Sequence, residues 1–135
     1  MLFDYALDFD MPPNVFNESI TWHSTTGAVP AYIAHLSNNG FHSGDPLAQV
    51  DDIGEPVELD TTNGPDDQGT MALLNLGELA VGQSVAFTLY IGLAPNSETA
   101  ELALHDIEHA ISAQATSGDT IGLFAIGTPT YQPTP

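Results

Sequence analysis

The sequence predicts a mainly β protein, an antiparallel β-sandwich of about seven to nine short strands with one helix near residues 97–114. Several runs alternate apolar and polar residues, clusters of Gly, Pro, Asn and Asp separate them, and one stretch has helical periodicity. The 135 residues are enough for one buried core. We therefore expect a single domain over residues 1–127 and a Pro/Thr-rich, polyproline-type tail over residues 128–135.

The chain begins with an amphipathic strand. Residues 2–10 alternate strictly, and their apolar face consists of Phe3, Tyr5, Leu7 and Phe9. The favoured interpretation is the first strand of the chain's own sandwich. The alternative is that residues 1–10 are an exchanged strand, which these four side chains attach to a neighbouring subunit by β-strand addition.

Short strands and turns follow in the first half of the chain. Strands are predicted at residues 18–24, 28–36, 47–50, 56–61 and 71–76. Trp22, the one tryptophan, is expected to fill the core, with a sugar-stacking platform as the alternative. The triplet Asn17-Glu18-Ser19 matches the N-glycosylation pattern, which makes Asn17 a candidate acceptor.

The strongest elements are a strand and the helix that follows it. A strand at the centre of a sheet is predicted by the alternation of Val85, Phe87, Leu89 and Ile91. Pro95 then turns the chain, and Asn96 or Ser97 caps the helix. The apolar stripe of this helix contains Ala100, Ala103, Leu104, Ile107, Ala110 and Ile111. Another buried strand is predicted at residues 120–126.

The run GQSVAFTLYIGLAPNSETAELAL, preceded by DDQGTMALLNLGELAVG, resembles a domain of secreted bacterial surface proteins. Many of those proteins carry a PEP-CTERM-type sorting tail and are associated with exopolysaccharide. The resemblance covers about residues 65–127, but no sorting tail is present and Gly92-Leu93-Ala94 replaces the family's G-A-A. It implies an extracellular or cell-surface location and a strand–helix architecture, and it brings no catalytic residues.

The charge balance excludes two classes of partner. The chain has 18 acidic residues and no Lys or Arg, which gives a net charge of −18. Because phosphate contacts need basic side chains, we predict no binding to nucleic acid or to anionic lipid. No 18-residue apolar span is present, so we predict no membrane insertion. The absence of tryptic sites suits a protein outside the cell, and adaptation to high salt is the competing explanation.

An acidic cluster in the turn-rich middle of the chain is a candidate calcium site. Ca²⁺ prefers several carboxylate and carbonyl oxygens from flexible loops. No EF-hand spacing is present, and a solvated acidic face is the favoured interpretation. Ca²⁺ is the one candidate cofactor, and its candidate ligands are Asp51, Asp52, Glu55, Asp60, Asp66 and Asp67.

One short motif suggests a catalytic metal. His105 to His109 matches H-x-x-E-H, the inverted zinc-peptidase motif, on the predicted helix. That chemistry needs a further acidic ligand, and no Glu follows Glu108. We therefore predict a solvated helix face and no enzyme.

These observations predict an extracellular structural protein that assembles with itself into a filament or matrix, with exopolysaccharide as a further candidate partner. The strand at residues 1–10 would join the subunits. The alternative is a carbohydrate-binding module of a secreted bacterial protein, in which aromatic residues form a shallow groove, with Trp22, Tyr32 and Tyr131 as candidates.

Overall fold

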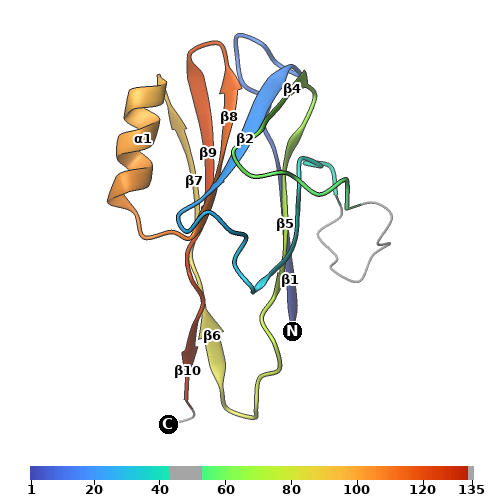
Figure 1. Cartoon of the computed structure of the whole chain (residues 1–135), viewed down its shortest axis with the longest axis vertical. Helices are drawn as coiled ribbons and strands as arrows, with labels where there is room; N and C mark the ends of the chain where they lie inside the picture. Colours follow the sequence, from blue (N-terminus) through green and yellow to red (C-terminus); the bar gives the residue numbers. More distant parts are fainter. Residues whose placement is uncertain (43–52, 134–135) are drawn as a thin grey trace.

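Antiparallel strands dominate the computed structural model, which describes residues 1–42 and 53–133 (Figure 1). A five-stranded sheet has the order β4–β2–β8–β9–β7, formed by Thr62–Asp66, Glu18–Ser24, Ile111–Ser117, Thr120–Ile126 and Leu89–Ala94. A three-stranded sheet has the order β1–β5–β3, formed by Leu2–Asp8, Gly69–Asn75 and Ile33–Ser37. A two-stranded ladder joins β10 (Thr130–Gln132) to β6 (Ser84–Ala86). The predicted fold class, a mainly β antiparallel sandwich with one helix, is confirmed.

The core lies between the two larger sheets. Alternation places Ile20 and Trp22 of β2 on the same face, and both are fully buried. They pack with Phe124 of β9 and with Ala72 and Leu74 of β5 in one cluster. Trp22 therefore fills the core as predicted, and its indole Nε1 donates a hydrogen bond of 2.9 Å to Asn38 Oδ1.

The second face of β9 is covered by helix α1 (Ser97–Asp106). Ala100 and Leu104 of α1 pack on Ile121 and Leu123 of β9. β9 has strands on both sides and apolar partners on both faces, which explains why its sequence is an almost continuous hydrophobic run. The prediction of a buried strand at residues 120–126 is confirmed.

The predicted helix is too long. Asn96 caps α1 as expected, since its side chain accepts a 2.9 Å hydrogen bond from the Thr99 amide. The helix ends at Asp106, however, and residues 111–117 form β8. Ala110 and Ile111 continue the helical stripe, whereas Ile111, Ala113 and Ala115 alternate with polar residues at the period of a strand. Pairing with β2 on one side and β9 on the other satisfies the β8 backbone, so tertiary contacts decide between the two.

The strand predicted over residues 84–91 divides into two pieces. β6 pairs with β10, and β7 pairs with β9, so the chain changes partner at Phe87–Thr88. Its predicted position at the centre of a sheet is wrong, because β7 is an edge strand with Ile91 56% exposed and Leu93 70% exposed. Residues 83–91 are largely apolar for two reasons. Val85, Phe87 and Leu89 pack on the core, and Tyr90 packs in the cluster that β9 forms with α1.

Other predicted elements shift or gain a partner. No strand forms at residues 56–61, and β4 forms at Thr62–Asp66 instead. The predicted strand at 28–36 is confined to β3, and the one at 47–50 lies outside the described residues. Within the expected tail, Thr130–Gln132 pairs with β6, and the Tyr131 hydroxyl donates a 3.0 Å hydrogen bond to Leu76 O. This part of the tail belongs to the folded domain.

Candidate functional site

The first strand and the connections at its ends form the candidate site. β1 pairs with β5 of the same chain, in a register that joins Leu2 to Asn75 and Asp8 to Gly69. It has no strand on its other side among the described residues, so it is an edge of its sheet (Figure 1). An edge strand leaves one row of backbone hydrogen-bonding groups unpaired by strands, which is the feature that strand addition uses.

The four predicted assembly residues all contact the core of their own chain. Phe3 packs edge-on against Phe87 with ring centroids 4.9 Å apart, and Tyr5 stacks on Phe124 at 5.3 Å. Leu7 is partly buried against the same cluster. Phe9 is buried beyond the end of the strand, on Gly122, where a Cβ atom would lie 2.6 Å from the Phe9 ring. The apolar face of β1 is therefore part of the core.

The beginning of β1 is held by backbone groups. The terminal ammonium of Met1 donates to Gly77 O, and the Leu76 amide donates to Met1 O at 2.8 Å. The Tyr131 hydroxyl contacts Leu76 O from β10. The polar contacts described at the beginning of β1 are therefore hydrogen bonds to backbone oxygens, and only one of their donors, the Met1 ammonium, is charged.

The polar face of β1 carries one buried carboxylate. Asp4 Oδ2 lies 2.8 Å from the imidazole Nε2 of His42, and both side chains are almost fully buried. Because the chain has no Lys or Arg, histidine is the one side chain that can place a positive charge beside a buried carboxylate.

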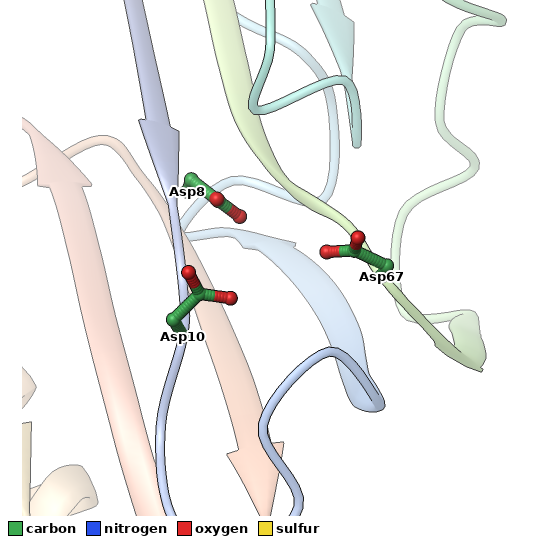
Figure 2. A group of neighbouring side chains, drawn as sticks. All are labelled: Asp8, Asp10 and Asp67. Atoms are coloured by element: carbon green, nitrogen blue, oxygen red, sulfur yellow. The ribbon is translucent and has the colours of Figure 1, made fainter.

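The end of β1 gathers three further carboxylates. Asp8 ends the strand, Asp10 follows two residues later, and Asp67 lies in the two-residue connection from β4 to β5. Figure 2 shows the Asp8 and Asp10 side chains pointing toward Asp67, whose carboxylate points back at them. One oxygen of each lies within 4.8 Å of the others, the only such group of three or more His, Asp or Glu ligands in residues 1–42 and 53–133.

A fourth carboxylate adjoins this group. Glu18 begins β2 opposite Asp66, the residue before Asp67, and is completely buried. Its Oε1 accepts a 3.2 Å hydrogen bond from the amide of Met11, the residue after Asp10. Its Oε2 is also buried and has no hydrogen-bond donor in the described part of the chain. A buried carboxylate oxygen without a partner is unfavourable, because it has lost its water.

The electrostatics of Asp8 reflect the same crowding. Burial raises the pKa of its carboxyl above the usual value, and the charges of Asp10, Asp67 and Glu18 raise it further. The backbone amide of Phe9 acts in the opposite direction by donating to the carboxylate. The pKa of Asp8 is therefore raised by two causes, burial first and the neighbouring carboxylates second.

The predicted calcium ligands divide among several places. Glu55, Asp66 and Asp67 line one open surface pocket of about 370 Å³, together with Asn63 and Gln68. Asp60 lies elsewhere, with Oδ1 2.6 Å from His23 Nδ1. Asp51 and Asp52 lie outside the described residues. Of the predicted set, only Asp67 joins a compact group of three among the described residues.

Sequence reasoning did not select Asp8, Asp10 or Glu18 as metal ligands. The spacing of Asp8 and Asp10 by two residues places both on one face at the end of a strand, and this signal was available. Glu18 and Asp67 come close to them only through the pairing of β2 with β4 and of β1 with β5. No local pattern predicts that meeting.

The H-x-x-E-H motif does not lie on a helix, because α1 ends at Asp106 and His109 follows in the connection to β8. His105 and His109 border an open pocket with His23 and Glu101. These side chains form no group of three ligands within 4.8 Å among the described residues. The five residues therefore do not form the helical arrangement of the zinc-peptidase motif, and the helix face predicted for them ends at Asp106.

Two other predicted sites can be placed. Asn17 is exposed in the connection before β2, so its predicted glycosylation sits on the surface. Of the aromatic residues proposed to bind sugar, Trp22 is fully buried and Tyr32 is partly buried, while Tyr131 is exposed. Trp22 therefore cannot be a sugar platform.

Comparisons with known proteins give no indication of function. No protein-family model, curated protein or solved structure matches this chain. The resemblance to secreted bacterial surface proteins therefore stays a prediction. In the described residues no helix combines the length and the apolar character needed to cross a membrane.

Proposed function

We propose that the protein is an extracellular structural subunit that assembles with itself into a filament or matrix, and that β1 of one subunit pairs with β5 of the next. One observation carries the proposal: among the described residues β1 is an edge strand that pairs with β5 alone, and its large side chains complete the core. A strand with these properties can be supplied by its own chain or by a neighbour with the same contacts.

The connection from β1 to β2 supports such an exchange. Residues 9–17 contain no helix or strand. Phe9 and Met11 are buried in the core and would move together with β1. Residues 12–17 are tied to the body of the domain by a few hydrogen bonds, including Asn14 N to Ser117 Oγ at 2.9 Å. A connection with so few regular contacts can serve as the hinge of a strand exchange. The new pairing would keep the β1–β5 register and the packing of Tyr5 on Phe124.

The extracellular location is part of the same proposal and rests on composition. A chain without Lys or Arg offers no site to trypsin-like proteases. The net charge of −18 makes free subunits repel one another, so their assembly needs cations that screen or bridge this charge. Exopolysaccharide is proposed as a further component of the matrix, following the resemblance.

Electron microscopy of the purified protein at neutral pH, in calcium-containing buffer, tests the proposal. We expect regular filaments. An excess of a synthetic peptide of residues 1–10 should shorten the filaments, because the peptide pairs with β5 in place of β1 from the next subunit. A control peptide with Ser in place of Phe3, Tyr5 and Leu7 should leave their length unchanged. Uniform small particles at high protein concentration, or filaments indifferent to the first peptide, would contradict strand addition.

A further inference from the structure

The geometry assigns a binding site for one Ca²⁺ ion to the carboxylates of Asp8, Asp10 and Asp67, with the charge of buried Glu18 acting on Asp8 from beside it. It lies where β1 leaves the three-stranded sheet and β4 passes to β5 (Figures 1 and 2). It differs from the predicted set, with which it shares only Asp67. The site is a property of the folded subunit, so it does not depend on strand exchange.

The spacing of the oxygens fits a calcium ion. Ca²⁺ binds six to eight oxygens at about 2.4 Å, so ligands on opposite sides of the ion are about 4.8 Å apart. One oxygen each of Asp8, Asp10 and Asp67 lies within 4.8 Å of the other two. Asp10 and Asp67 are exposed, which leaves room for water to complete the coordination.

Buried Glu18 is the second observation that points to a cation. Its side chain is fully buried, and Met11 N, directly after Asp10, binds one oxygen. The other oxygen, Oε2, has no donor among the described residues, and the charge of Glu18 acts on Asp8. Asp8 Oδ1 is likewise buried without a donor there. A solvated acidic face would not bury two carboxylate oxygens away from water, whereas a cation bound at Asp8 would offset the charge of both carboxylates.

The chain has no cation of its own to offer at this place. Lys and Arg are absent, and the imidazoles found near carboxylates are engaged elsewhere: His23 with Asp60, His42 with Asp4 and His105 with Asp106. A metal ion is therefore the partner that these carboxylates lack. Its ligands would come from the end of β1, from the segment after it and from the connection that joins β4 of one larger sheet to β5 of the other.

Isothermal titration calorimetry of chelator-stripped monomer with CaCl₂ tests the site, in about 0.15 M NaCl to screen diffuse attraction. We expect one saturable site per chain, weakened about tenfold or more in Asp10→Asn and in Asp67→Asn. Both residues are exposed, so these variants should fold, and circular dichroism verifies it. Asp119→Asn, in the exposed β8–β9 turn, removes the same charge and should bind like the wild type.

Other outcomes would overturn the assignment. Absence of saturable heat would do so, as would equal weakening in Asp119→Asn, which would show attraction to the overall charge alone. Equal or tighter binding of MgCl₂ would overturn the choice of calcium. Because the titration uses monomer, its failure leaves the strand-addition proposal standing, and failure to form filaments leaves the calcium site standing.

Discussion

The two ends of β1 differ in how they are attached to the domain. At the beginning of the strand, Met1 bonds to the backbone of Leu76 and Gly77, and Phe3 packs on Phe87. At the other end Asp8 meets Asp10, Asp67 and the buried Glu18, and no described positive group balances them. The first end is stabilised by contacts that the chain supplies itself, whereas the second needs something from solution. The attachment of β1 to the domain should therefore depend on the calcium concentration at its Asp8 end and not at its Met1 end.

Removing the aromatic contact should weaken β1 most. Tyr5→Ala deletes a ring that stacks on Phe124 in the core, and since Tyr5 is partly buried we expect the free energy of unfolding to fall by about 2–3 kcal/mol. Urea denaturation measures the change. Tyr5→Phe keeps the stacked ring and should stay close to wild type. An equal loss in both variants would assign the effect to the hydroxyl instead of the ring.

Calcium should strengthen the acidic end. At a free concentration one hundred times the dissociation constant, binding to the native state adds about 2.7 kcal/mol to the free energy of unfolding. For a domain of this size that raises Tm by about 10 °C. Differential scanning calorimetry with calcium and with chelator measures the shift. Asp67→Asn should lose most of it, and an undiminished shift in that variant would contradict the assigned site.

Neutralising the buried carboxylate should remove the need for calcium. In chelator, Glu18→Gln removes an uncompensated buried charge and keeps an oxygen for the Met11 amide, so we expect the free energy of unfolding to rise by about 1 kcal/mol. Urea denaturation in chelator compares it with Glu78→Gln, an exposed control that should change little. A clear loss of stability in Glu18→Gln would show that the charge is compensated within the chain.

The histidines far from β1 should matter least. The double variant His105→Ala/His109→Ala changes side chains around the end of α1 that form no compact metal group, so we expect a change below about 0.5 kcal/mol. Its calcium affinity, measured by calorimetry, should equal that of the wild type. A lower affinity would place a calcium ligand at α1.

Much of the fold follows from the sequence alone. Strict alternation predicts β2 and the burial of Trp22, and the position of Asn96 before an acidic turn predicts the start of α1. β8 is missed because Ala110 and Ile111 continue the helical stripe, whereas Ile111, Ala113 and Ala115 alternate as a strand does, and the neighbouring strands decide. The spacing of apolar residues predicts an element where it fits only the helical or only the strand period, and it does not where a segment shows both.

The acidic site is less predictable for a related reason. The predicted cluster followed acidic density along the chain, whereas the structure joins Asp8 and Asp10 to Asp67 through strand pairing. Burial of Glu18 also depends on tertiary packing, because its sequence position suggests only the start of a strand. A ligand set that strand pairing brings together from distant parts of the chain cannot be read from one segment.

A disulfide trap tests most directly whether β1 joins subunits. The chain has no cysteine, and Leu2 pairs with Asn75 across β1 and β5 at an exposed position, so Leu2→Cys/Asn75→Cys places two thiols within bonding reach. After assembly in calcium and mild oxidation, a non-reducing gel should show a ladder of covalent oligomers, which neither single variant extends beyond dimers. Filaments that yield only internally cross-linked monomers would show that β1 stays in its own chain and that another surface joins the subunits.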